Sequence, residues 1–174
     1  MELHHILVPT DFSVYAEQAL QEALMLTVRE HAQLLLLHVL PRCEWMWTDM
    51  PRPTHLQLMQ DLQTDAEQRL QTVAAHQRWP IETVVVWGDP ATEICRIAQA
   101  YETDLIVMGT HGRTGLARLF RGSVAEHVVR AAPCAVLIVR TYPARAAQVA
   151  QSPVLRSLHR YSPREAAWSA CVLD

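Results

Sequence analysis

Five short runs of mostly apolar residues, separated by longer stretches with helical spacing, limit the possible folds of this chain more than any other feature. The runs cover residues 6–8, 34–39, 81–87, 105–108 and 135–139. Strands that alternate with helices form parallel sheets, and strands that are apolar throughout are typical of sheets covered on both faces. We therefore predict an α/β fold with a doubly wound five-stranded parallel sheet and helices on both faces.

Four of the intervening stretches have the spacing of amphipathic helices. Apolar residues recur every three or four positions over about 13–28, 55–77, 89–101 and 123–132. We expect Ser13 to cap the first helix, and Asp89, with Pro90 at the first helical position, to open the third. Residues 41–54 contain three prolines and are expected to form a loop.

The charged residues exclude several classes of function. The net charge of −3 gives no reason to expect general binding to nucleic acid or to a membrane surface. All 15 basic residues are arginine, since the chain contains no lysine. This excludes Schiff-base chemistry, a pyridoxal-phosphate anchor and the phosphate-binding lysine of a P-loop.

The cysteines and the chain start indicate a cellular compartment. The four cysteines show neither a CxxC pair nor the spacing of a zinc site, so we expect free thiols in a reducing environment. Cys134 is expected to be a small buried hydrophobe. Residues 1–5 lack the features of a signal peptide, and every apolar run is too short to cross a bilayer. We therefore expect a cytoplasmic protein.

A glycine cluster follows the fourth predicted strand. Four of the five glycines lie within residues 109–122, and Gly122-Ser123 opens the last predicted helix. Glycine lets other atoms approach the backbone, and the start of a helix offers unpaired N–H groups that suit a phosphate. Glycines after a strand can also serve only as turn residues. The strand before the cluster and the helix after it favour a phosphate-binding loop.

These residues resemble the universal stress protein family. Gly109, Gly112, Gly122 and Ser123 match the family's nucleotide-binding pattern Gly-x2-Gly-x9-Gly-Ser/Thr. The segments 6–13, 37–39, 104–112 and 133–139 are also similar, so the likeness covers about residues 1–140. The resemblance implies a Rossmann-like fold of the adenine nucleotide alpha hydrolase type with strand order 3-2-1-4-5. It also implies that residues 1–140 form the domain and that 141–174 is a C-terminal extension.

The resemblance further implies which residues bind ATP, or ADP or AMP, with Mg²⁺ accompanying the nucleotide. The residues that would frame the adenine and ribose are Pro9, Thr10, Asp11 and Val39. The residues that would line the ribose and phosphates are Met108, Gly109, His111, Gly112, Arg113, Gly122, Ser123 and Val124. The resemblance also implies a homodimer that pairs its last strands, here through residues 136–139.

Several of these residues have a second interpretation. Asp11 either contacts the ligand or caps the first helix region, and no second carboxylate is evident beside it for a metal ion. His111 is either a general base or a loop side chain near phosphate. His4 and His5 point to opposite faces of a strand and are not expected to share a metal. The loop residues Trp45, Met46, Trp47 and Met50 either cover the base or pack elsewhere.

Three functions follow from this sequence. The first is a nucleotide-binding stress-response protein with a regulatory role, because the signature is intact and a catalytic base is not evident. The second is a slow ATP hydrolase in which the arginines of residues 113–121 stabilise phosphate charge. The third is a dimeric adaptor that keeps the glycines for turns. The tail is either disordered or docked through Trp168 and Val172.

Overall fold

The computed structural model describes residues 2–42, 52–110 and 124–140, together with residues 151 and 153. The predicted loop residues 45–50, His111 and the tail anchors Trp168 and Val172 lie outside the described residues. The extension 141–174 also lies outside them, apart from residues 151 and 153.

Five strands form one sheet in the order β3-β2-β1-β4-β5. The strands are β1 (His5–Pro9), β2 (Gln33–Leu40), β3 (Ile81–Trp87), β4 (Leu105–Thr110) and β5 (Ala135–Arg140). Every neighbouring pair is parallel. The predicted fold class and strand order are therefore confirmed.

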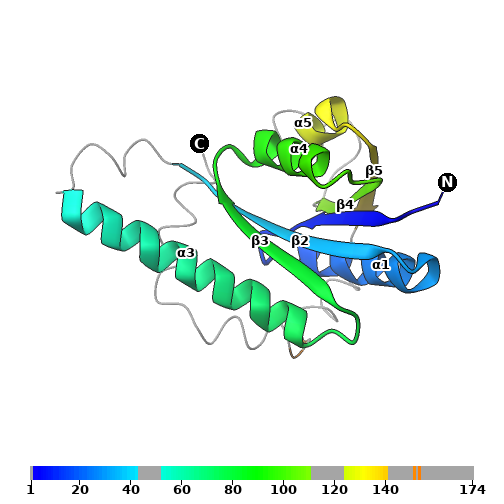
Figure 1. Cartoon of the computed structure of the whole chain (residues 1–174), viewed down its shortest axis with the longest axis horizontal. Coiled ribbons are helices and arrows are strands. Elements are labelled where there is room, and N and C mark those ends of the chain that lie inside the picture. Colours follow the sequence, from blue (N-terminus) through cyan, green and yellow to red (C-terminus); the bar gives the residue numbers. More distant parts are fainter. Residues whose placement is uncertain (1, 43–51, 111–123, 141–150, 152, 154–174) are drawn as a thin grey trace.

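Helices cover both faces of this sheet, as Figure 1 shows. They are α1 (Val14–Glu30), α3 (Arg52–Ala75), α4 (Pro90–Ala100) and α5 (Val124–Ala131). The expected loop 41–54 is too long, because α3 already begins at Arg52. Pro53 fits there, since the first turn of a helix needs no donor from its backbone nitrogen. Among the described helices, none is both long and apolar enough to cross a membrane.

The core has two halves, one on each face of the sheet. On the first face, α1 and α3 pack against β1 and β2 through buried residues that include Leu20, Leu36 and Leu70. On the second face, α4 and α5 contribute Ile94, Ile97 and Val128. The strands supply alternate side chains to the two halves, which is why nearly every residue of β1 and β2 is apolar.

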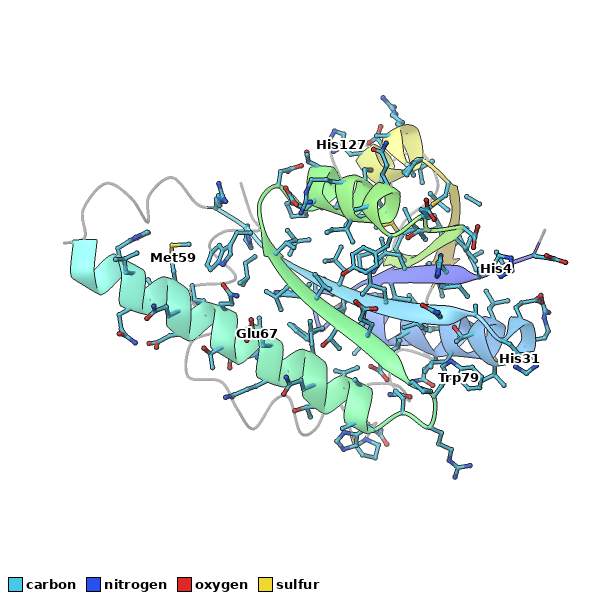
Figure 2. The ribbon with its side chains drawn as sticks, in the orientation of Figure 1. His4, His31, Met59, Glu67, Trp79 and His127 are labelled. Carbon is cyan, nitrogen blue, oxygen red and sulfur yellow. The ribbon has the colours of Figure 1, made fainter. Side chains whose placement is uncertain are left out.

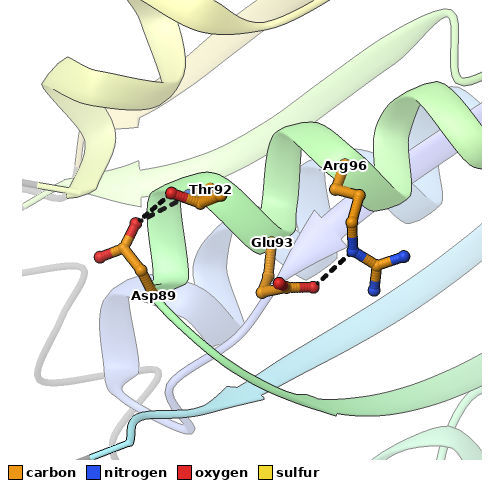
Figure 3. A network of polar contacts seen from close by, with 4 residues as sticks. All are labelled: Asp89, Thr92, Glu93 and Arg96. Atoms are coloured by element: carbon orange, nitrogen blue, oxygen red, sulfur yellow. Dashed lines mark hydrogen bonds and ion pairs between the residues drawn. The ribbon is translucent and has the colours of Figure 1, made fainter.

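Both predicted helix caps are present. The hydroxyl of Ser13 accepts a hydrogen bond from the backbone N–H of Ala16 at 3.3 Å. The carboxylate of Asp89 accepts from the N–H and the hydroxyl of Thr92 at 2.9 and 2.6 Å (Figure 3). These two bonds lower the pKa of Asp89. Because the first turn of a helix leaves its N–H groups without helical partners, the two caps fix where α1 and α4 begin.

The amino ends of the strands are joined by contacts that the sequence pattern did not predict. One oxygen of the Asp104 carboxylate accepts from the backbone N–H groups of His4 and His5 at 2.7 and 2.9 Å. These hydrogen bonds lower the pKa of Asp104. At the same edge, the rings of His31 and Trp79 lie 6.3 Å apart (Figure 2). The carboxylate therefore joins the start of β1 to the start of β4. The two strands then pair from Ile6 and Leu105 onwards.

Candidate functional site at the carboxyl edge of β1 and β4

The winding of the chain reverses between β1 and β4. From β1 the sheet grows through β2 to β3, and the chain then crosses over to β4 and β5 on the other side. In such sheets ligands bind beyond the carboxyl ends of the strands at this reversal. The carboxyl edge of β1 and β4 is therefore where a ligand site is expected.

The structure brings the described part of the predicted site to this edge. Pro9 ends β1 opposite Leu37, and Val39 lies two residues further along β2. Since Leu7 pairs with Ile106, Met108 lies as far along β4 as Pro9 does along β1. The other described residues of the prediction are Thr10, Asp11, Gly109 and Val124; His111, Gly112, Arg113, Gly122 and Ser123 lie outside the described residues.

A tight turn follows β1 and displays Thr10 and Asp11. The hydroxyl of Thr10 accepts from the N–H of Phe12 at 3.0 Å, and the Asp11 carboxylate accepts from the N–H of Ser13 at 3.0 Å. The N–H of Thr10 donates to the carbonyl of Leu37 at 2.8 Å. Asp11 therefore has the local capping role that was one of its two interpretations. Its contact with a ligand stays a prediction.

A buried histidine supports this turn from below. His38 on β2 is 2% exposed, and its Nδ1 lies 2.7 Å from the carbonyl oxygen of Thr10. Burial lowers the pKa of His38 to about 4, against the opposing effects of the Thr10 hydrogen bond and the Asp11 carboxylate. The imidazole is thus neutral near pH 7, and its Nδ1–H donates to Thr10. The sequence signal was the single polar residue in the apolar run 34–39.

Gly109 has a packing role that is independent of any ligand. A Cβ at this position would meet the backbone of Tyr15 in the first turn of α1, with the carbonyl carbon only 2.6 Å away. The Ala16 nitrogen would lie 3.2 Å away. A helix backbone this close to a strand requires glycine, because no rotamer change can make room. The first glycine of the predicted signature therefore lets α1 approach β4.

The described groups at this edge suit binding better than acid–base catalysis. They consist of backbone amides and carbonyls, the Thr10 hydroxyl and the Asp11 carboxylate, with a neutral His38 beneath them. Within the part of the chain that the structure describes, no group of three His, Cys, Asp or Glu side chains has the arrangement of a metal site. Desolvation raises the pKa of the Cys95 and Cys134 thiols, which pack against the second half of the core. Cys134, which the sequence predicts to be buried, is only partly buried, like Cys95 on α4.

The start of α5 completes the described part of the site. Val124, the first residue of this helix, is 39% exposed. Glu126 lies in the first turn, where its carboxylate forms an ion pair with Arg130 at 2.6 Å. The first turn of an α-helix presents unpaired backbone N–H groups and the positive end of the helix dipole. Because α5 leads into the parallel strand β5, its first turn lies at the carboxyl edge of the sheet. That end suits the phosphates of a ligand held at the edge.

Comparisons with known proteins agree with this architecture. Residues 2–140 match the model of the universal stress protein family. Universal stress protein MJ0531 of Methanocaldococcus jannaschii is 32% identical over 137 residues, which cover 78% of this chain and 81% of that protein.

Two solved structures illustrate the shared fold. That of MJ0577, also from M. jannaschii, has a TM-score of 0.68 and 28% identity over 82% of this chain and 99% of its own. An Arabidopsis thaliana universal stress protein family protein, solved with AMP bound, has a TM-score of 0.54 and 20% identity over 81% of this chain and 93% of its own.

The packing role of Gly109 predicts an asymmetry between two glycines. Gly109→Ala should lower the free energy of unfolding by about 1–3 kcal/mol, because the new methyl group meets the backbone of Tyr15. Gly88→Ala is the matched control, since the three atoms nearest to its Cβ belong to the Glu93 side chain, which can change rotamer, and not to the backbone. Urea denaturation measures both, and equal losses in the two variants would contradict the packing argument.

The buried imidazole predicts a pH dependence of stability. The folded pKa of His38 is about 4 against an ordinary value of 6.5, so the unfolded chain binds more protons between these values. The stability that His38 contributes is complete above pH 6.5 and is lost as the pH falls towards 4, by at most about 1.4 kcal/mol per pH unit. His38→Gln keeps an N–H donor without titrating there.

The measurement is the free energy of unfolding of both proteins from pH 7 to pH 4. As the pH falls, the free energy of unfolding should decrease more for the wild type than for His38→Gln. In NMR spectra, the imidazole resonances of His38 should still have the chemical shifts of the neutral form at pH 5.5. A pH-independent difference between the two proteins would show that the imidazole titrates alike in both states.

Proposed function

This chain belongs to the universal stress protein family, and from that premise we propose that it binds an adenine nucleotide, ATP above all, and has a regulatory role in the stress response. The observation that carries the proposal is the uninterrupted pattern of Gly109, Gly112, Gly122 and Ser123, which begins at Gly109 near the end of β4. This pattern begins at the sheet edge where the Thr10–Asp11 turn lies.

The base and ribose would lie against β1 and β2. Pro9 ends β1, Thr10 and Asp11 form the turn that follows it, and Val39 lies on the neighbouring strand, so apolar and polar groups meet there. Hydrogen bonds to charged or polar groups of this turn would orient the ribose, while Val39 and Met108 offer apolar contact. The Arabidopsis thaliana protein with AMP bound supports this class of ligand.

The phosphates would lie between the glycine segment and the start of α5. The residues proposed for them are Met108, Gly109, His111, Gly112, Arg113, Gly122, Ser123 and Val124. Backbone N–H groups at a helix start bind anions well, and arginine adds charge-assisted hydrogen bonds. Mg²⁺ would accompany a triphosphate and neutralise part of its charge. Asp11 is the carboxylate of the described edge that could approach such an ion.

We further propose a cytoplasmic homodimer formed through the last strand. β5 lies at one edge of the described sheet, and its residues 136–139 are apolar. An edge strand presents backbone N–H and C=O groups that a second copy can pair with. Leu137 is 39% exposed on this strand, which makes it a suitable contact for that copy. Neither nucleic acid nor a membrane is proposed as a partner.

Nucleotide binding predicts thermal stabilisation. ATP at about 100 times its Kd should add about 2.7 kcal/mol to the free energy of unfolding and raise Tm by roughly 5–10 °C. Gly122→Val should abolish this shift, because the added side chain fills the proposed phosphate cradle. Gly88→Ala, at the one glycine outside the cluster of residues 109–122, should still show the Tm shift with ATP.

The same experiment separates the alternatives. If ATP, ADP and AMP all leave Tm unchanged, the nucleotide proposal is wrong and the adaptor function takes its place. If ATP shifts Tm and the purified protein also releases ADP, with turnover lost in Ser123→Ala, the protein is a slow hydrolase. Denaturing the purified protein and identifying the released nucleotide tests the ligand directly.

The dimer proposal predicts the effect of one exposed charge. Leu137→Lys should convert the dimer to a monomer, because a lysine on an edge strand disfavours pairing with a second sheet. Leu56→Lys on α3 is the matched control, since Leu56 is 61% exposed and α3 packs against β3 and β2, at the opposite end of the sheet from β5. Light scattering after size exclusion gives the masses. A dimer that persists in Leu137→Lys would exclude this interface.

A further inference from the structure

Phe12 has a backbone conformation that its side chain disfavours. Its φ is 62°, in the left-handed region, where a residue with a Cβ costs roughly 1–2 kcal/mol. Glycine would adopt this conformation freely. The turn between β1 and α1 must therefore contain contacts that compensate, and those contacts must involve the Phe12 side chain, because glycine would otherwise serve better.

The Phe12 ring lies between a histidine and an arginine. Its centroid is 4.6 Å from that of His38, with the ring planes tilted by 35°. The guanidinium carbon of Arg69 lies 5.7 Å from the same centroid, within the range of a cation–π contact. Phe12 is also partly buried against the core between α1, α3 and the sheet. Phe12 thus joins the turn to β2 and to α3.

Arg69 is held in place from its own helix. Its Nε lies 2.8 Å from the Asp65 carboxylate one turn earlier in α3, and its side chain is only 13% exposed. This ion pair keeps the guanidinium close to Asp65, and partial burial strengthens the attraction between the cation and the ring. Asp65, Arg69, Phe12 and His38 therefore form a continuous set of contacts, here called the turn support.

The turn support ends on the residues that carry the proposed base and ribose contacts. His38 reaches the carbonyl oxygen of Thr10 at 2.7 Å, and Phe12 donates its N–H to the Thr10 hydroxyl at 3.0 Å. Asp11 lies between Thr10 and Phe12 in the sequence, and its carboxylate accepts a hydrogen bond from the N–H of Ser13. Loss of the ring contact would let the chain at Phe12 relax out of the left-handed region. Thr10 and Asp11 would then turn away from the edge.

We propose that Arg69 is a positioning residue of the nucleotide site, acting through the Phe12 ring to hold the Thr10–Asp11 turn in its binding geometry. The inference deepens the proposed function and rests on it. Arg69 lies on α3, outside the glycine signature, and acts on the base and ribose end of the site. The proposed phosphate contacts belong to a different segment of the sequence, so we do not expect them to depend on Arg69.

Two substitutions at Arg69 test the role. Arg69→Met removes the charge at similar length and should weaken binding of adenosine and of ATP by the same factor, about three- to tenfold. Arg69→Lys restores a cation above the ring and should recover most of the affinity. Arg96→Met on α4 is the control, because it removes an arginine that is also ion-paired, with Glu93 at 2.7 Å, but belongs to a different helix.

A double-mutant cycle tests whether Arg69 acts through the ring. Phe12→Gly accepts the left-handed backbone but removes the stack, so Arg69→Met should cause no further loss of affinity in that background. Isothermal titration calorimetry gives each affinity, at a temperature where the Tm of every variant shows it to be folded. Independent, additive losses would overturn the proposal, as would a larger loss for ATP than for adenosine.

The outcomes for wild type and variant distinguish the two proposals. If wild type binds ATP and Arg69→Met binds it equally well, the positioning role is wrong and the nucleotide function stands. If wild type binds no adenine nucleotide, the proposed function fails and the positioning role fails with it. If Arg69→Lys remains as weak as Arg69→Met, the cation–π contact is not the cause.

Discussion

The parallel pairing of β1 with β2 on one side and β4 on the other places every other part of this molecule. Ile6, Leu7 and Val8 are at most 1% exposed, so both faces of β1 are sealed by helices and both edges by strands. A strand enclosed in this way has one register, since a shift by one residue would exchange the two halves of the core. The turn after Pro9 therefore leaves the sheet at a fixed point.

Because the turn after Pro9 starts at a fixed point, its Thr10 carbonyl lies where the buried His38 side chain can donate a hydrogen bond to it. The His38 imidazole is almost fully buried, and its hydrogen bond to Thr10 uses the only charge state that burial permits. Burial would remove the hydration of a protonated imidazole, which is why the pKa of His38 falls. The Phe12 ring and the Arg69 guanidinium extend the same support outward to α3.

Gly109 shows that one residue can serve the fold and a proposed site together. Its missing side chain lets the first turn of α1 reach β4, and it also begins the glycine pattern. The presence of this glycine alone therefore says little about a ligand, because packing already requires it. The proposed function therefore depends more on Gly112, Gly122 and Ser123, which lie outside the described residues.

The sequence by itself determined the elements of this protein. Apolar runs indicated the five strands, helical spacing indicated α1, α3, α4 and α5, and local chemistry indicated the caps at Ser13 and Asp89, since each signal lies within a few neighbouring residues. The order of the strands came from the resemblance to a family, because alternation alone permits several orders. Local patterns could not reveal that α3 begins at Arg52, where Pro53 is compatible with a first turn.

Only the tertiary structure decided which distant residues meet. Asp104 accepts hydrogen bonds from the backbone of His4 and His5 across about a hundred positions, and Arg69 on α3 reaches Phe12 in the turn after β1. The close approach of Tyr15 to Gly109 is a third case. Such contacts follow from how helices cross the sheet, and no periodicity records that geometry. The sequence therefore indicated what this edge can bind, and the packing decided how its turn is held.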